Sequence, residues 1–175
     1  LACGTGDVLF ALEKQDHHQL VGADFSRPML KHARDKSVPA DLVQGDGLNL
    51  PFSNNSFSTI TCAFGVRNFA DRPTAFDECV RLLQTGGRFL ILEFFPPGQA
   101  WYQWPYRIYL KEVLPRVGAW VSGSDRAYDY LRDSVEAFVD REQLQVELQS
   151  AGFKNTEFTD FTGGVATLIT AERLA

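Results

Sequence analysis

Strand-like and helical segments alternate along most of this chain, and the alternation limits the fold more than any other feature. Strands that alternate with helices form a parallel sheet covered by helices. We therefore expect an α/β fold with a mostly parallel, doubly wound sheet. Only a short Thr-Gly-Gly turn separates the last two runs, so we expect them to pair as an antiparallel hairpin. The strand-like runs, rich in apolar, β-branched and aromatic residues, are 19–25, 40–46, 57–65, 88–95, 156–161 and 164–173.

Length and composition are those of one ordinary globular domain. The 175 residues are 45% hydrophobic and 22% charged, so we expect a single domain over residues 1–175. A net charge of −5 argues against a basic face, so we expect no nucleic-acid partner. No apolar run approaches the length of a membrane span, and no signal peptide is recognisable. These features predict a cytoplasmic protein that contacts a membrane at most peripherally.

Caps and cysteines complete the general reading of the chain. Ser26, Asp71 and Asp140 each precede a helical pattern and are expected to cap it, and Gly152 is expected to end the last helix. The three cysteines have spacings that match neither a zinc site nor a disulfide framework, which suits a reducing compartment. We interpret them as small buried side chains and expect no metal.

A glycine turn at Gly4-Thr5-Gly6 follows apolar residues and precedes a helical pattern, and the next strand ends at Asp24. In this arrangement the carboxylate at the strand end accepts hydrogen bonds from ribose hydroxyls. A dinucleotide site would favour a third glycine at position 9, where this chain has Leu9, and Asp7 would repel a phosphate. A carboxylate there favours a positively charged ligand such as S-adenosylmethionine. The alternative is that Asp7 only stabilises its own helix.

A second acidic turn, Asp46-Gly47, ends the next strand-like run. Its carboxylate is positioned to accept from an adenine amine, with Met29 against the ring. The alternatives are an ordinary Asp-Gly turn and a core methionine.

Four longer stretches together resemble the ubiquinone/menaquinone biosynthesis C-methyltransferases, a family of class I S-adenosylmethionine-dependent enzymes. They are "LACGTGD", "GADFSRPMLKHAR", "GDGLNLPFSNNSFSTITCAFGVRNFAD" and "RLLQTGGRFLILEF". The most specific parts are "FGVRN" at 64–68 and "GGRFLILEF" at 86–94. The resemblance implies a Rossmann-like class I methyltransferase fold.

The resemblance also implies an activity, methyl transfer from S-adenosylmethionine to a ring carbon of a polyprenyl benzoquinol or naphthoquinol. Thr5, Asp24, Asp46 and Gly47 then match cofactor contacts, and Ala63 stands where the family often has a serine. The family has helices before its first strand, so Leu1 resembles the tail of that strand and an N-terminally truncated chain is expected.

Methylation of a quinol ring requires a hydroxyl to ionise, which an enzyme must favour. Arg67 follows the run 57–65 at the edge where open α/β sheets bind ligands, and we predict it as the catalytic residue that stabilises the phenolate or orients a water. The alternative, an ion pair with Asp71 or Glu93 that fixes the loop, stays open. Asn68 is a candidate for substrate binding or for a turn cap.

Residues 96–137 interrupt the alternation with an aromatic insertion, and we predict a lid over the substrate. Tyr128 is a candidate substrate contact within it, and contact with a membrane interface is an alternative for the segment. The quinol type and the oligomeric state, with a homodimer among the options, stay open. Two other functions stay open as well: methylation of another lipid or small molecule, and a non-catalytic cofactor-binding subunit.

Overall fold

The computed structural model describes residues 1–14, 19–96 and 125–174. Its helices alternate with strands over the first half of the chain, as the sequence predicts, except that no helix separates the strands at 41–44 and 57–63. The helices are α1 (Asp7–Glu13), α2 (Arg27–Asp35), α3 (Arg72–Leu82), α6 (Asp125–Glu136) and α7 (Arg141–Ala151), with 3₁₀ turns η1 (Val66–Asn68) and η4 (Thr162–Gly164). The strands are β1 (Val21–Asp24), β2 (Asp41–Gln44), β3 (Phe57–Ala63), β4 (Leu83–Phe94), β5 (Phe153–Phe161) and β6 (Ala166–Arg173).

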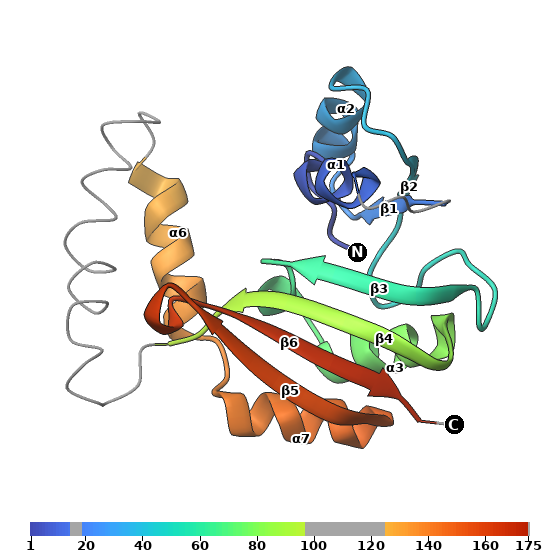
Figure 1. Ribbon diagram of the computed structural model, residues 1–175. Helices are drawn as coiled ribbons and strands as arrows, with labels where there is room; N and C mark the ends of the chain where they lie inside the picture. The colour runs from blue at the N-terminus through green and yellow to red at the C-terminus, as the bar shows by residue number, and fades with distance from the viewer. Residues whose placement is uncertain (15–18, 97–124, 175) are drawn as a thin grey trace.

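The strands pair in two groups (Figure 1). Strands β1 and β2 are parallel, and the second group has the order β3-β4-β6-β5. Within it β3 and β4 are parallel, whereas β6 is antiparallel to both β4 and β5. The predicted α/β class and the antiparallel hairpin at the end of the chain are therefore confirmed.

The first three residues connect the two groups of strands. The amino group of Leu1 donates to the Thr61 carbonyl in β3 at 2.7 Å, and the Cys3 amide donates to the Ala23 carbonyl in β1 at 3.0 Å. Residues 1–3 thus lie between β1 and β3 and bond to both, although they form no strand of their own. This arrangement brings the ends of β1 and β3 to the same side of the glycine turn.

The predicted caps hold the helices that frame this region. Ser26, Asp71 and Asp140 each accept a backbone N–H from the first turn of the following helix, at 3.4, 3.2 and 2.9 Å. Gly152 ends α7 with a left-handed φ of 106°. All four positions behave as the sequence predicts.

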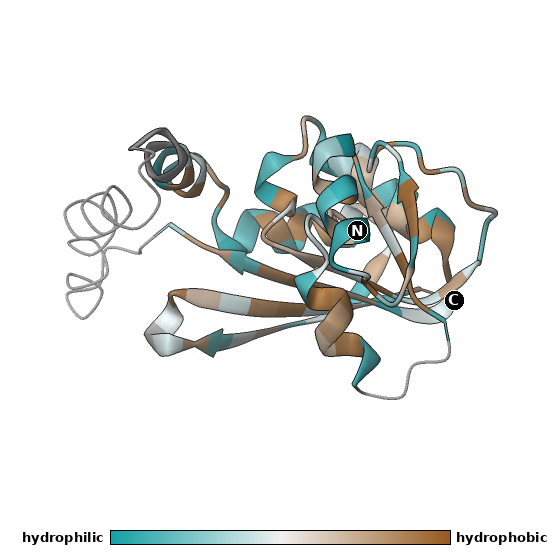
Figure 2. Cartoon of the chain, turned by 90° about the horizontal axis from the view of Figure 1, so that it is seen from above, coloured by the Kyte–Doolittle hydropathy of each residue, from teal (hydrophilic) through white to brown (hydrophobic). Residues whose placement is uncertain are grey.

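The core lies between the four-stranded sheet and the helices α3 and α7, which contact each other and the sheet (Figure 1). Phe89 of β4 packs between Phe76 of α3 and Phe153 of β5, with ring centroids 6.1 and 5.6 Å apart, and all three are fully or almost fully buried. Apolar residues run along the strands and along parts of the helices, with polar residues on the rest (Figure 2). This packing fixes β4, whose C-terminal end carries Glu93 and Phe94, two residues of the region described below.

The cysteines follow the same packing. Cys62 and Cys79 are buried, and burial raises the pKa of the Cys62 thiol to about 11, so it stays protonated. Cys3 is half-buried and free.

Part of the predicted insertion at 96–137 lies outside the described residues. Of this segment the structure describes Pro96, the helix α6 and the residue that follows it. The lid therefore stays a prediction. No helix among the described residues is both long and apolar enough to cross a membrane.

Candidate functional site

A cavity of about 570 Å³ opens where β1, β2 and β3 end. The carboxyl ends of parallel strands are where open α/β sheets bind ligands, because the loops there diverge. The volume is within the range of small-molecule sites. Its lining residues come from the glycine turn, the three strand ends and η1: Leu1, Ala2, Gly4, Asp24, Phe25, Ser26, Met29, Gly45, Asp46, Gly47, Leu48, Phe64, Gly65, Asn68, Phe69 and Ala70.

Asp24 organises the glycine turn. Its carboxylate accepts the Gly4 amide at 2.7 Å through one oxygen and the Ser26 amide at 2.8 Å through the other. Gly4 has a left-handed φ of 54°, and no atom lies within 4 Å of the place a β-carbon would take. The turn therefore leaves open space above Gly4, and Asp24 retains lone pairs for a ligand.

The other two residues of the glycine turn do not face the cavity. Neither Thr5 nor Gly6 lines the cavity. Gly6 begins α1, and a β-carbon on it would lie 2.4 Å from the Val38 side chain, so close packing explains this glycine. The Thr5 hydroxyl donates to Asp7 at 2.7 Å and accepts from Lys36 at 3.0 Å.

Asp7 does not supply charge to the cavity, contrary to the expectation from its position in the sequence. Its exposed carboxylate pairs with the Lys36 ammonium at 2.9 Å, and hydrogen bonds from Lys36 and then Thr5 lower its pKa. Any preference of the cavity for a cationic ligand rests instead on Asp24 and Asp46, which do line it.

Asp46, Gly47 and Met29, the residues expected from the sequence to form an adenine subsite, all line the cavity. One Asp46 oxygen accepts the Leu48 amide at 3.0 Å, so this carboxylate also shapes its own turn. Met29 is 45% exposed, which is high for a core methionine and leaves an apolar surface at the cavity wall.

Ala63 lies on the wall of a different hollow. This second cavity, of about 350 Å³, is lined mostly by apolar side chains of α1, β1, β3 and β4. It contains neither Asp24 nor Asp46. The carboxylate-lined cavity is therefore the better candidate for a charged cofactor.

The backbone at Phe64 is strained. Its φ of 57° is left-handed, which is an outlier for a bulky residue and costs about 1–2 kcal/mol. Hydrogen bonds hold the turn in place, because the Phe64 amide donates to the Leu92 carbonyl at 2.7 Å and the Phe64 carbonyl accepts from Arg67 at 2.8 Å. The Phe64 ring stacks on Phe94 with centroids 4.4 Å apart. Strain of this kind gathers at functional sites.

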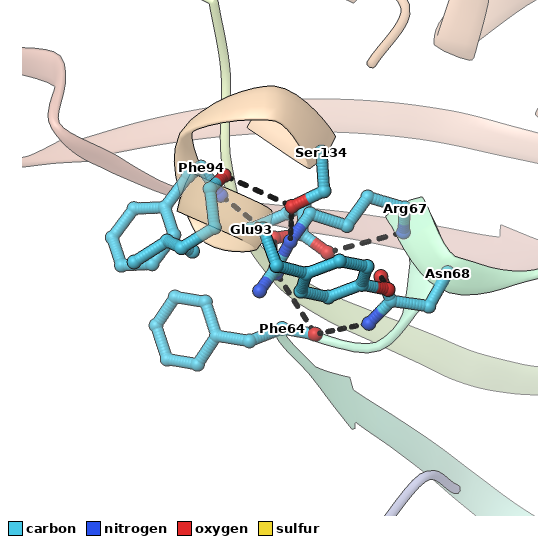
Figure 3. A network of polar contacts seen from close by, with 8 residues as sticks. Phe64, Arg67, Asn68, Glu93, Phe94 and Ser134 are labelled. Carbon is cyan, nitrogen blue, oxygen red and sulfur yellow. Dashed lines mark hydrogen bonds and ion pairs between the residues drawn. The ribbon is translucent and has the colours of Figure 1, made fainter. Parts of the chain in front are cut away.

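Arg67 forms an ion pair with Glu93 behind this turn (Figure 3). The Arg67 Nη1 to Glu93 Oε1 distance is 2.5 Å, and the two side chains are 8% and 0% exposed. Burial raises the pKa of Glu93, while the Arg67 guanidinium opposes that change. Arg67 Nε donates to the Ser134 hydroxyl of α6 at 3.2 Å. One of the two ion pairs left open by the sequence, the pair with Glu93, is thus formed, and Arg67 itself does not line the cavity.

Asn68 lies next to Arg67 on η1 and does line the cavity. Its Nδ2 points toward the Phe64 carbonyl at 3.5 Å (Figure 3), and its Oδ1 accepts the Tyr130 hydroxyl of α6 at 2.8 Å. The side chain of Tyr128 lies outside the described residues, although its backbone belongs to α6.

Sequence reasoning missed two parts of this rim, the strained Phe64 and Ser134, whereas Tyr130 belongs to the aromatic segment that the sequence predicts as a lid over the substrate. Of the two, only Phe64 had a signal, because it begins the "FGVRN" stretch. Ser134 is far from η1 along the chain and reaches it through α6, so no local pattern indicates it.

Solved structures show which fold this is. A solved S-adenosylmethionine-dependent methyltransferase from Thermotoga maritima has a TM-score of 0.70 at 18% identity, over 99% of this chain and 79% of that one. The phosphoethanolamine N-methyltransferase 2 of Haemonchus contortus, solved with S-adenosylmethionine, also has a TM-score of 0.70, at 15% identity, over 99% of this chain and 47% of that one. The chain has the fold of the S-adenosylmethionine-dependent methyltransferases.

The family is equally clear. Residues 1–173 match the ubiE/COQ5 methyltransferase family. The demethylmenaquinone methyltransferase of Thermus thermophilus is 42% identical over 99% of this chain and 80% of its own length. The ubiquinone/menaquinone biosynthesis C-methyltransferase of Rickettsia felis is 31% identical over 99% of this chain and 75% of its own. The chain belongs to the ubiE/COQ5 methyltransferase family and is a methyltransferase.

The described residues fit the cofactor of this class. The open space above Gly4 admits a ligand close to the backbone. Asp24 and Asp46 provide acceptors for hydroxyl and amine groups, and half-exposed Met29 provides an apolar surface for a ring.

Proposed function

We propose that this protein transfers a methyl group from S-adenosylmethionine to a ring carbon of a polyprenyl quinol, of the demethylmenaquinol or demethoxyubiquinol type. The family and the names of its relatives support the reaction. The observation that carries it to this chain is the cavity in which Gly4, Asp24 and Asp46 meet the η1 residue Asn68. A cofactor subsite and a candidate substrate group thus share one hollow.

The cofactor subsite is assigned to Gly4, Asp24, Met29, Asp46 and Gly47. When bound, the cofactor supplies a methyl group on a cationic sulfur. Asp24 would accept from its ribose hydroxyls and Asp46 from its adenine amine, with Met29 against the ring. Thr5, Gly6 and Ala63 do not line the cavity, so they would act through the backbone or by shaping the turn.

On the substrate side, Arg67 and Asn68 would favour the ionised quinol. A guanidinium is permanently charged and does not accept a proton, so Arg67 would not act as the base. Because Arg67 does not line the cavity, it would favour a phenolate through its charge and through the turn that it holds, and not by direct contact. Its Nη1 and Nε bond to Glu93, Phe64 and Ser134, which fixes its orientation before a substrate arrives. A preorganised positive charge of this kind is effective in a site that excludes water.

Mass spectrometry tests the proposal directly. Purified protein is incubated with S-adenosylmethionine and either demethylmenaquinol or a demethoxy-type benzoquinol, and we expect one methyl group to be gained on a ring carbon. Binding of S-adenosylmethionine without methyl gain on either quinol would reject the proposed substrate class.

Two aspartates near the glycine turn provide matched variants for the cofactor assignment. Asp24→Ala should weaken S-adenosylmethionine binding by about 1.5–3 kcal/mol, because a charge-assisted hydrogen bond is lost. Asp7→Ala removes a carboxylate that is exposed and does not line the cavity, so affinity should stay near wild type. Calorimetry giving equal losses for both variants would contradict the assignment of Asp24.

A further inference from the structure

The helix α6 contacts the cavity rim through two side chains one turn apart. Tyr130 donates to Asn68 at 2.8 Å, and Ser134 accepts from Arg67 at 3.2 Å. Residues i and i+4 share one face of a helix, so α6 presents both groups to η1 together. The two η1 side chains assigned to the substrate are therefore each held by a partner on α6.

The Phe64 carbonyl and the Tyr130 hydroxyl together determine which end of the Asn68 amide faces which neighbour. The Phe64 carbonyl can only accept a hydrogen bond, so the amide nitrogen must face it. The amide oxygen then faces Tyr130, whose hydroxyl donates to it. With its oxygen held by Tyr130 and one N–H directed at the Phe64 carbonyl, the second N–H of Asn68 is the donor left for the cavity. A donor suits a ligand with an acceptor oxygen.

We propose that Tyr130 is a positioning residue that orients the Asn68 amide so that its N–H group meets an oxygen of the quinol or phenolate substrate. The inference rests on the proposed function for the nature of the ligand. Tyr130 acts through Asn68 and does not itself carry out chemistry. The hydroxyl holds the amide oxygen away from the ligand, where it would repel a phenolate.

The exposure of Tyr130 and Asn68 to solvent distinguishes a positioning role of Tyr130 from a role in stabilising the fold. Tyr130 is 59% exposed and Asn68 is exposed as well, so water competes for their hydrogen bond and its contribution to folding is small. Loss of the hydroxyl should therefore appear in substrate kinetics while the melting temperature is unchanged. A purely structural contact would give the reverse pattern.

The experiment compares Tyr130→Phe, which removes only the hydroxyl, with Asn68→Ala and the double variant. We expect Tyr130→Phe to lower kcat/KM for the quinol about fivefold, the size of one neutral hydrogen bond, with S-adenosylmethionine affinity unchanged. In the Asn68→Ala background the same change should have no further effect, because its target is gone. Ser134→Ala is the matched control, and its effect through Arg67 should persist in that background.

Two results would overturn the proposal: wild-type kcat/KM in Tyr130→Phe, or an undiminished effect of Tyr130→Phe when Asn68 is already alanine. Failure of the proposed function is recognised separately, since the wild-type protein would then methylate neither quinol. In that case the side-chain amide signals of Asn68 in a nitrogen-15 spectrum decide the matter. A shift in Tyr130→Phe supports the orienting role, and unchanged signals reject it.

Discussion

Two arginine–glutamate pairs hold two loops of this molecule, and they differ in burial and in the backbone beside them. The Arg67 clamp, made of Arg67 and Glu93, holds the turn after β3, and its carboxylate is fully buried. The Arg81 clamp, made of Arg81 and Glu78, holds the loop after β2, and the Arg81 side chain is 32% exposed. In the Arg81 clamp, Glu78 accepts the Leu50 amide at 2.6 Å. Both clamps thus hold a backbone segment through charge-assisted hydrogen bonds.

The backbone held by each clamp is different. Beside the Arg81 clamp the left-handed residue is Asn55, at a φ of 55°, and asparagine adopts this region at low cost. Beside the Arg67 clamp it is Phe64, for which the same region is strained. Phe64 lines the carboxylate-lined cavity, whereas Asn55 does not. The comparison indicates that one clamp anchors a loop, while the other keeps a strained turn in place beside a ligand site.

The largest expected difference between the clamps is in stability. Arg67→Met leaves the Glu93 carboxylate buried without its counter-charge and should lower the free energy of unfolding by about 3 kcal/mol. Arg81→Met should cost only about 1 kcal/mol, because water reaches this clamp. Urea unfolding of the two variants checks the order. Equal losses would mean that burial does not distinguish the clamps.

A double variant sharpens this result. Replacing both members of the Arg67 clamp, as Arg67→Met with Glu93→Leu, removes the buried charges together. Such replacements are often close to neutral for stability. Recovery of unfolding free energy without recovery of activity would show that the pair is retained for the site.

The second prediction concerns activity. Arg67→Lys keeps the positive charge but loses the planar fork that reaches Glu93, Phe64 and Ser134 at once. We expect kcat to fall roughly 100-fold, the low end for removing one preorganised electrostatic contact, with S-adenosylmethionine affinity near wild type. Arg81→Lys, the matched change in the other clamp, should leave kcat within a few-fold of wild type. Similar rate losses in both variants would contradict a special role for Arg67.

Much of this fold could be predicted from local patterns. Caps at Ser26, Asp71 and Asp140 act within one turn of helix, so the sequence contains all the parts of each contact. The hairpin of β5 and β6 followed from the length of the turn between them. The separation of β1 and β2 from the other strands was not predicted, since strand pairing depends on contacts distant in the sequence.

Residues of the candidate site were predictable only where the position of a single residue in the sequence was enough to indicate its role. Asp24 ends β1, Asp46 follows β2 and the glycine turn precedes α1, and these positions identify them. Asp7 was misjudged because Lys36, which neutralises it, is distant in the sequence and reaches it only through the fold. The net charge at a site thus depends on ion pairs such as Asp7 with Lys36, and a local sequence pattern contains only one of the two residues.

The third prediction isolates the strain at Phe64. Phe64→Ala and Phe64→Gly both remove the stack on Phe94, but alanine keeps the strained φ and glycine does not. The glycine variant should therefore be more stable than the alanine variant by about 1 kcal/mol, the reverse of the usual order in regular structure. Asn55→Gly should stay near wild type. Thermal unfolding of the three variants checks this, and an alanine variant as stable as the glycine one would refute strain at Phe64.

The smallest expected difference is in the response of stability to pH, where the two clamps should have opposite signs. Hydrogen bonds from Arg81 lower the pKa of Glu78 below its ordinary value of 4.5. A lowered pKa contributes stability above the unfolded value, and this contribution is lost as the pH falls through the folded value. Burial raises the pKa of Glu93, so its contribution is present below pH 4.5 and is lost as the pH rises through the folded value.

Removing each titrating group should therefore change the acid limb of the stability curve in opposite directions. Between pH 7 and about pH 3, Glu78→Gln should lose stability less steeply than wild type, because a group that destabilises on protonation is gone. Glu93→Gln should lose stability more steeply, because a group that binds its proton more readily in the folded state is gone. The comparison uses the slope of stability against pH and not the stability itself, so any pH-independent loss of stability in Glu93→Gln does not affect it. Urea midpoints measured across this range give the slopes, and the same sign of change in both variants would contradict the contrast between a buried and a solvated clamp.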